Sequence, residues 1–283
     1  MESATIALII PVHNRIEYTA KCLDSIFKQS YDNFFVIVVD DGSTDGTNEM
    51  IKSNFKLVEV IEGNGNLFWT ASVNLGLRKA YANGAQYFMT LNNDTVAPED
   101  FLDNMLQWAK KYPRSIIGAL ELDINKNIPI YGGERISWTW KNSLSLLHIL
   151  PKAKQVGMHE VSYLPGRGLL IPRVVFDSIG FFDEVSFPHY YADFEFTYRA
   201  TKHKYKNFIN YDAKLYTYPE ESGDTKNRKV KSIKGYINHL FDIKGGGNLK
   251  NFTIFSLRHC PKINLPVYLI TGYIRRLLGY WIK

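Results

Sequence analysis

Apolar and amphipathic stretches alternate along the first third of the chain and predict strands and helices in turn. Four short runs rich in apolar residues predict buried strands at 5–12, 34–39, 56–61 and 87–91. The segments after them carry apolar residues at helical spacing and predict helices over 18–29, up to about 54, 70–82 and 98–111, with Pro98 in the first turn of the last. This alternation predicts an α/β fold with a mainly parallel sheet and helices on both faces.

Polar residues follow two of these predicted strands at the point where each ends. Asp40 and Asp41 follow the second strand, and Asn93 and Asp94 follow the fourth. Ligands of open parallel sheets bind beyond the carboxyl ends of the strands. We therefore expect a ligand site at this edge, where one of the aspartates 40 and 41 caps the next helix and the other faces the crevice.

Asp94 is the candidate metal ligand of this edge. A hard cation such as Mg²⁺ commonly takes one or two carboxylates together with substrate phosphates. An alternative that fits the local sequence equally well is that residues 93–95 form a turn that caps the following helix.

The segment HYYADFEFTYRA at 189–200 carries two acids that do not share a helix face, Asp193 and Glu195. Asp193, near the start of a predicted helix, is a candidate general base. Glu195 has the i, i+4 spacing to pair with Arg199. The alternative is that both acids only stabilise the helix N-terminus.

Two further side chains suit a ligand that carries phosphate and a sugar or planar face. Arg167 lies between two glycines, where it meets a phosphate or carboxylate or else remains on the solvated surface. Trp69 follows a loop rich in Gly and Asn, where it faces such a ligand or else packs into the core.

The composition excludes several classes of protein. The 283 residues are 45% hydrophobic, and 18 Tyr, 17 Phe and 5 Trp argue against general disorder. Two cysteines far apart in sequence exclude a disulfide scaffold and favour a reducing, cytoplasmic compartment. We expect no secretory signal and no transmembrane span, since the charge-free apolar stretch 263–274 is shorter than the roughly 20 residues a span needs.

Basic residues gather toward the C-terminal end of the chain. Residues 226–283 contain twelve Lys or Arg and a single acid. The net charge of the whole chain is only +6, so the residues before this segment carry a net negative charge. One helical stripe near the end consists of Ile270, Tyr273, Ile274, Leu277, Leu278 and Trp281. This pattern is typical of an interfacial helix on an anionic membrane surface. The alternatives are packing on the rest of the chain or on a second subunit, as in a homodimer; the tail is too apolar for a nucleic-acid-binding arm.

Taken together, these segments resemble family 2 glycosyltransferases of the GT-A fold. The resemblance covers about residues 4–220 and is carried, in the family's order, by IIPVHNR at 9–15, VVDDGSTDGT at 38–47, Asn66 followed by NLG at 74–76, LNNDT at 91–95 and ADFEFTYRA at 192–200. The stretch GNLFWT at 65–70 also resembles bacterial transferases for deoxysugars such as rhamnose.

The resemblance implies an inverting enzyme that moves a sugar from a nucleotide-diphosphate sugar to a hydroxyl of a saccharide or lipid-linked saccharide, in bacterial cell-surface polysaccharide synthesis. Residues 1–225 would form the GT-A catalytic domain, with a nucleotide-sugar half at about 1–115 and an acceptor half at about 116–225. Residues 226–283 would be a basic amphipathic extension at the inner face of the cell membrane.

The family's motifs also imply roles for single residues. Asp193 matches the catalytic base of a single displacement, and Asp94 matches the carboxylate that holds Mn²⁺ or Mg²⁺ on the diphosphate. We expect the nucleotide-sugar donor to bind at Pro11, Val12, Asn14, Asp41, Asn66, Trp69, Asn93 and Arg167.

Three departures from the family's pattern leave alternatives open. Asn93 is an amide where an acid is usual, Ala192 precedes the base where Glu is usual, and Tyr218 stands where a metal-binding His is often found. One alternative is a non-catalytic nucleotide-sugar-binding relative that scaffolds polysaccharide assembly. A nucleotidyltransferase fits less well, because no Gly-rich phosphate loop follows the first predicted strand.

Overall fold

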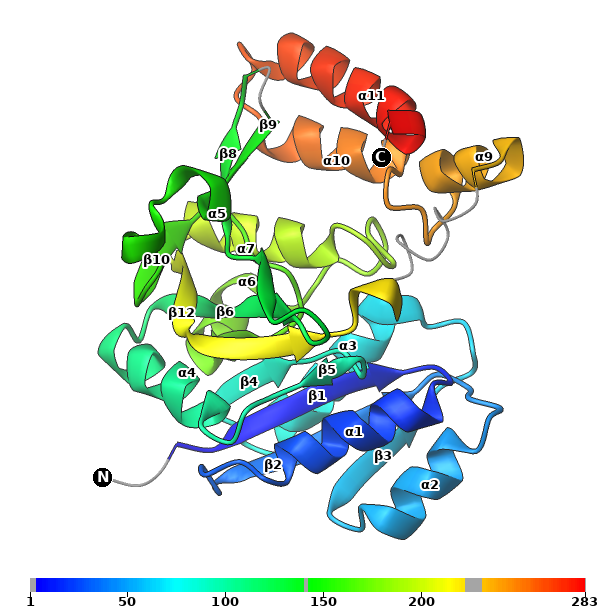
Figure 1. Cartoon of the computed structure of the whole chain (residues 1–283), viewed down its shortest axis with the longest axis vertical. Coiled ribbons are helices and arrows are strands. Elements are labelled where there is room, and N and C mark those ends of the chain that lie inside the picture. Colours follow the sequence, from blue (N-terminus) through cyan, green and yellow to red (C-terminus); the bar gives the residue numbers. More distant parts are fainter. Residues whose placement is uncertain (1–3, 140–141, 222–230, 283) are drawn as a thin grey trace.

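The computed structural model of the protein describes residues 4–139, 142–221 and 231–282. Its N-terminal part alternates strands and helices, as predicted (Figure 1). The elements are β1 (Ile6–Val12), α1 (Ile16–Ile26), β2 (Phe34–Asp40), α2 (Thr47–Asn54), β3 (Val58–Glu62), α3 (Phe68–Ala82), β4 (Tyr87–Thr90), β5 (Thr95–Val96) and α4 (Phe101–Lys111).

The first four strands form a parallel sheet in the order β3-β2-β1-β4, with helices on both faces. Alternate residues of β1 show why these runs are apolar throughout. Ile6 and Leu8 belong to the core that α1 and α4 cover, whereas Ala7 and Ile9 belong to the core that α3 covers. Each side chain of a strand buried on both faces must be apolar, so the predicted α/β class is confirmed.

The start of α4 differs from the prediction. Pro98 is not in its first turn, because the helix begins at Phe101 after the N-cap residue Asp100. The carbonyl of Pro98 accepts hydrogen bonds from the backbone N–H of Phe101 at 3.0 Å and from Nε2 of Gln29 at 2.7 Å. Pro98 therefore lies in a turn that is bonded to the segment after α1.

The middle of the chain extends the sheet and makes it mixed. Its strands are β6 (Ser115–Asp123), β7 (Ile128–Tyr131), β8 (Glu134–Ser137), β9 (Asn142–Ser145), β10 (Met158–Val161), β11 (Leu169–Pro172) and β12 (Lys206–Thr217). Its helices are α5 (Leu146–Ile149), η1 (Lys152–Lys154), α6 (Arg173–Ile179), α7 (Ala192–Lys202) and η2 (Pro219–Glu221). The order of the main sheet is β10-β12-β6-β11-β4-β1-β2-β3, with β5 paired to β12 and β7 to β6, while β8 and β9 form a separate hairpin.

Strand β11 is antiparallel to its neighbour β4, and this reversal matters for the site. Leu169, the first residue of β11, pairs with Thr90, the last residue of β4. The segment just before β11, with Arg167, is therefore delivered to the same sheet edge as the carboxyl end of β4.

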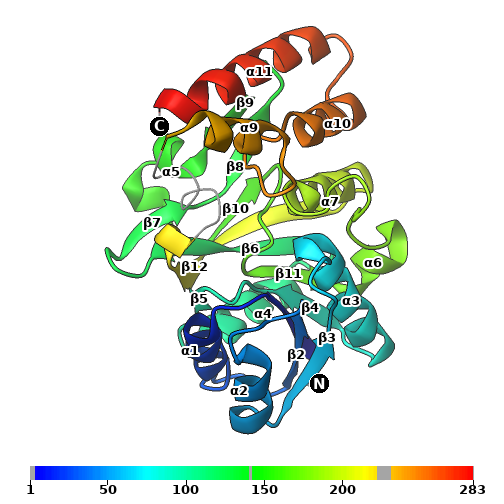
Figure 2. The same ribbon diagram turned by 90° about the vertical axis from the view of Figure 1, so that its right-hand side faces the viewer.

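Within the described residues 231–282 lie three helices: α9 (Ile233–Phe241), α10 (Leu249–His259) and α11 (Leu265–Ile282). Figures 1 and 2 show them stacked at one end of the molecule, with α10 between α11 and α7. Nε2 of His259 lies 3.3 Å from Oε1 of Glu195, and Arg258 pairs with Asp183 at 2.7 Å. The predicted boundary near Thr225 lies outside the described residues, and the division into domains stays a prediction.

The apolar stripe of α11 largely faces solvent. Tyr273 bonds Thr253, but the other five members of the stripe are 38–59% exposed: Ile270, Ile274, Leu277, Leu278 and Trp281. Arg276 of the same helix stacks 3.6 Å above the ring of Phe252 and bonds the hydroxyl of Tyr191. None of the helices in the described ranges is long and apolar enough to span a membrane.

Candidate active site

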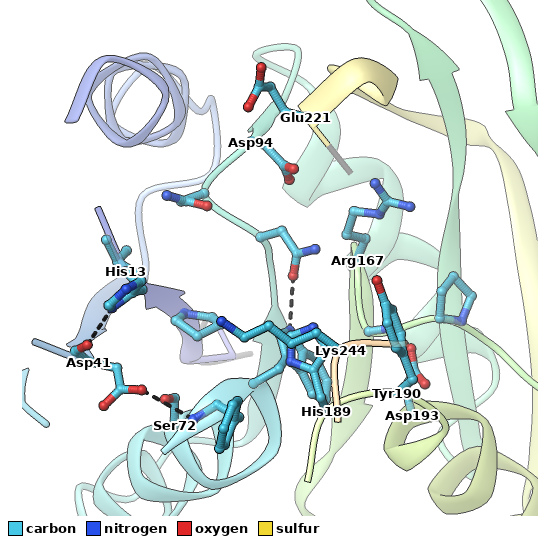
Figure 3. Close-up of a pocket in the computed structure, with 18 of the residues that line it drawn as sticks. His13, Asp41, Ser72, Asp94, Arg167, His189, Tyr190, Asp193, Glu221 and Lys244 are labelled. Atoms are coloured by element: carbon cyan, nitrogen blue, oxygen red, sulfur yellow. Dashed lines mark hydrogen bonds between the residues drawn. The ribbon is translucent and has the colours of Figure 1, made fainter. Parts of the chain in front are cut away.

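A cavity of about 550 Å³ lies at the carboxyl edge of β1 and β4 (Figure 3). Its walls come from the ends of these strands, the turn before α3, the segment before β11, residues 189–194 and the turn between α9 and α10. Asp41, Asp94 and Asp193 all line it, although they are far apart in sequence. Three carboxylates singled out from the sequence are thus brought to one cavity.

The carboxylate of Asp41 holds the turn that leads into α3. Its Oδ1 accepts from the backbone N–H of Gly65 at 2.8 Å, and its Oδ2 accepts from those of Leu67 and Phe68 at 2.9 and 3.1 Å. A carboxylate has about four acceptor positions, so about one remains for a ligand. Asp40 instead supports its own turn, with Oδ1 accepting from the backbone N–H of Ser43 at 3.0 Å.

Asp94 combines burial with an unused acceptor. Its Oδ1 is buried without a hydrogen-bond partner, while Oδ2 accepts from Nη1 of Arg15 at 3.2 Å. No group of three His, Cys, Asp or Glu in the described part of the chain is placed to hold a metal ion. Asp94 nevertheless fits a divalent cation that takes a single protein carboxylate and completes its shell with substrate phosphates and water.

Asp193 is the second residue of α7. Its Oδ2 accepts from the backbone N–H of Gly166 at 2.8 Å, and its Oδ1 from that of Phe194 at 2.9 Å. Burial raises the pKa of Asp193, and the backbone donors act in the opposite direction.

Gly166 can occupy this position only because it lacks a side chain, since an added Cβ would lie 2.3 Å from the ring of Trp69. Trp69 itself lines the cavity and donates from Nε1 to Oδ1 of Asn92 at 3.0 Å.

Arg167 lines the cavity, and its guanidinium group is bound by two neighbouring side chains. Its Nη2 lies 3.1 Å from Oε2 of Glu121, and its Nη1 donates to Oγ1 of Thr217 at 3.1 Å. Glu121 is 1% exposed, and its burial raises the pKa of its carboxyl while the nearby Arg167 lowers it. Arg167 is therefore not a freely solvated surface arginine.

The other predicted donor-site residues divide into two groups. Pro11, Val12 and Asn93 line the cavity, although Nδ2 of Asn93 donates to Thr19 at 2.9 Å. Asn14 and Asn66 do not line it. Oδ1 of Asn14 accepts from the backbone N–H of Thr44 at 2.8 Å, and Asn66 bonds within its own exposed turn.

Other cavity residues were not singled out from the sequence. His13 and Arg15 flank the predicted Asn14, and Nδ1 of His13 lies 2.6 Å from the carbonyl of Asp41. His189 belongs to the acidic segment already recognised, but it carried no signal of its own. Burial, with a contribution from the nearby Lys244, lowers the pKa of His189 to about 4, so its ring is neutral at neutral pH. Lys244 lies in the C-terminal extension, where no motif marks it.

The family model for glycosyl transferase family 2 matches residues 7–180, most of the chain. The chain belongs to this family. The motifs predicted this family correctly. The finer likeness of 65–70 to deoxysugar transferases stays a prediction.

Curated relatives carry the same general description. "Glycosyltransferase GlyA" of Streptococcus pneumoniae is 31% identical over 115 residues, 39% of this chain and 16% of its own. An uncharacterized glycosyltransferase of Rickettsia prowazekii is 28% identical over 191 residues, 64% of this chain and 54% of its own. The chain thus spans about half or less of these relatives.

Solved structures share the fold at low sequence identity. TarS 1–349 of S. aureus has a TM-score of 0.59 and 15% identity over 98% of this chain and 91% of its own. A mannosyltransferase of Pyrobaculum calidifontis in complex with GDP-Man and Mn²⁺ has a TM-score of 0.59 and 15% identity over 97% of this chain and 87% of its own. These likenesses confirm the predicted GT-A fold.

Proposed function

We propose that this glycosyltransferase moves a sugar from a nucleotide-diphosphate sugar to an acceptor hydroxyl with inversion, by a single displacement in which Asp193 is the base. The observation that carries the proposal is the half-buried carboxylate of Asp193 in the wall of the cavity that Asp41 and Asp94 also line. Solved relatives in complex with GDP-Man or with UDP-GlcNAc support a nucleotide-sugar donor.

The surroundings of Asp193 suit proton transfer from a sugar hydroxyl. A hydroxyl is a weak nucleophile until a base takes its proton in the transition state. Burial raises the pKa of Asp193, which makes its carboxylate a better proton acceptor. The N–H of Gly166 bonds Oδ2 and that of Phe194 bonds Oδ1, and these two bonds hold the carboxylate in place.

Asp94 would hold a divalent cation, Mn²⁺ or Mg²⁺, together with the donor diphosphate. Its partnerless Oδ1 supports this assignment, as do relatives solved with Mn²⁺. When bound, such a cation stabilises negative charge on the diphosphate leaving group.

The nucleoside would lie at the side of the cavity formed by Pro11, Val12 and Asp41, where Asp41 keeps about one acceptor position for a base. Asn14 and Asn66 would act there through the turns they bond rather than by contact. Trp69, Asn93 and Arg167 would line the sugar and phosphate part of the site.

The acceptor would be a saccharide, free or lipid-linked, of bacterial cell-surface polysaccharide synthesis, with the enzyme at the inner face of the cytoplasmic membrane. Exposed apolar residues on α9 and α11 support this location: Ile233, Ile237, Phe241, Ile270, Ile274 and Trp281. Basic residues of the same segment would add about 1 kcal/mol each on anionic lipid. Sedimentation with anionic lipid vesicles tests the membrane contact. The alternative is that the same surface forms a homodimer, which light scattering would detect.

The reaction is tested with Asp193→Asn. A thermal-shift panel with UDP, dTDP and GDP sugars first identifies the donor. We expect turnover to fall about 100-fold or more while donor affinity is retained, because the base acts on the acceptor. Asp24→Asn, at an exposed position on α1, is the matched control. Near-normal turnover of Asp193→Asn would exclude this base, and NMR of the product's anomeric configuration decides inversion.

A further inference from the structure

The turn between α9 and α10, with the sequence Lys244-Gly245-Gly246-Gly247, has no part in the function proposed above. It nevertheless belongs to the wall of the cavity, because Lys244 and Gly246 line it. Figure 3 shows Lys244 beside His189, in the cavity that also holds Asp94 and Asp193. The C-terminal extension therefore reaches the site as well as packing on α7.

The glycines give this turn a defined shape. The backbone N–H of Gly245 donates to the carbonyl of Asp242 at 2.9 Å, and that of Gly247 donates to the carbonyl of His239 at 3.1 Å. A Cβ on Gly245 would lie 2.4 Å from the carbonyl oxygen of Asn238, and one on Gly247 would lie 2.1 Å from the ring of His239. The turn packs too closely on the end of α9 to admit side chains, so the backbone of Lys244 is held in place.

The helix that follows ties the turn to the catalytic side of the cavity. Asn248 caps α10 by accepting from the backbone N–H of Asn251 at 2.9 Å. Nδ2 of Asn251 donates to the carbonyl of Tyr190 at 3.1 Å. Tyr190 lies three residues before Asp193, so the turn and the proposed base are attached to the same segment.

Lys244 differs from the other cations of the cavity wall in its pairing. Arg15 is paired with Asp94, and Arg167 is paired with Glu121. Lys244 makes no ion pair with any residue in the described ranges; its Nζ lies 5.5 Å from the ring centroid of Phe68. Its neighbour His189 is neutral at neutral pH. An ammonium group in a substrate cavity without a carboxylate partner is suited to an anionic ligand.

We propose that Lys244 binds a phosphate group of a substrate, so that the C-terminal extension supplies a binding residue to the transfer reaction. This inference rests on the proposed function, which makes phosphate the anion present in the cavity. Two sources share that chemistry: the diphosphate of the donor and a phosphate carried by a lipid-linked acceptor. Phosphoryl oxygens of either accept charge-assisted hydrogen bonds from an ammonium group.

The experiment compares Lys244→Gln with the wild type by isothermal titration calorimetry. Of UDP, dTDP and GDP, the one that stabilises the wild type most is chosen. This nucleoside diphosphate and its nucleoside are the two donor probes. The acceptor probes are farnesyl diphosphate and farnesol, titrated with saturating nucleoside diphosphate present. Lys250→Gln, at the next exposed lysine and outside the cavity, is the matched control, and Lys244→Arg should restore binding.

If the donor is the source, Lys244→Gln binds the nucleoside diphosphate about tenfold more weakly and the nucleoside as before. If the acceptor is the source, nucleotide binding is unchanged and farnesyl diphosphate binds about tenfold more weakly, with farnesol unaffected. Wild-type affinity of Lys244→Gln for both diphosphates would overturn the proposal and leave the proposed function intact. A wild type that binds no nucleotide would instead overturn the proposed donor site.

Discussion

The guanidinium of Arg15 donates a hydrogen bond from Nη1 to Oδ2 of Asp94 at 3.2 Å, and from Nη2 to the carbonyl of Glu221 at 2.8 Å. Arg15 precedes α1 with a positive φ of 70°, a backbone conformation that directs the chain after β1 back across the sheet edge. The carboxylate proposed to hold a divalent cation is thus already paired with a protein cation. Arg15 and a metal ion would compete for Asp94.

We expect Arg15→Asn to bind Mn²⁺ several-fold more tightly than the wild type in the absence of nucleotide, because it frees Oδ2 of Asp94 from a neighbouring positive charge. Asparagine is chosen because it tolerates a positive φ. Electron paramagnetic resonance of free Mn²⁺ measures the affinity. Asp94→Asn should lose this binding and Asp24→Asn should keep it, whereas an unchanged affinity in Arg15→Asn would show that the two cations do not compete.

The acid limb of the kcat/KM profile should lie at a higher pH than an ordinary aspartate would give. The proposed base must be ionised, so activity is present above the pKa of Asp193 and is lost as the pH falls through it. Burial raises this pKa above the usual 3.8. Initial rates across the acid range, with circular dichroism to confirm folding, test this. A limb at or below pH 3.8 would contradict the raised pKa.

Gly166→Ala should damage both stability and transfer. The added methyl group would lie 2.3 Å from Cζ2 of Trp69, so the ring or the segment before β11 must move. We expect the free energy of unfolding to fall by about 1–3 kcal/mol, as for overpacked cores. Turnover should fall too where the backbone shifts, because the N–H of Gly166 bonds the carboxylate of Asp193.

Urea denaturation and initial rates measure these two effects. Gly279→Ala is the control, since among the described residues no atom beyond its own stretch of α11 lies within 4 Å of a Cβ built there. Equal free energies of unfolding and equal rates in the two variants would mean that the close packing of Gly166 on Trp69 affects neither stability nor transfer.

Glu195→Gln should destabilise the protein at neutral pH. Burial raises the pKa of Glu195, but the hydrogen bond with His259 and the ion pair with Arg199 outweigh it and leave the pKa below the usual 4.5. A carboxyl whose folded pKa is lowered stabilises the fold above its unfolded pKa, and this is lost as the pH falls through the folded pKa.

We therefore expect Glu195→Gln to lower the free energy of unfolding by about 3 kcal/mol at pH 7, as when one partner of a buried pair is removed. The difference from the wild type should shrink as the pH falls below 4.5. Urea denaturation between pH 7 and pH 3 measures it. A difference that does not change with pH would mean that the charge of Glu195 is not what stabilises the contact between α7 and α10.

The pattern of apolar residues located strands best where a strand is buried on both faces. The runs that became β1, β2 and β4 were located because every position of such a strand must be apolar. The start of α4 was predicted wrongly: Pro98 suits a first helical turn, but its carbonyl bonds Gln29, which is remote in sequence. The pairing of Glu195 with Arg199 was predicted correctly because it is local, set by one turn of helix.

The fold class, the family and the carboxylates at the strand ends could be predicted from the sequence, because each follows from periodicity, a motif, or the rule that parallel strands end at one edge. The folded chain was needed to see that Arg15 pairs with Asp94, that Glu121 holds Arg167, and that Lys244 reaches the cavity from the C-terminal extension. These relationships join residues remote in sequence. They depend on how strands and helices pack, which no local spacing encodes.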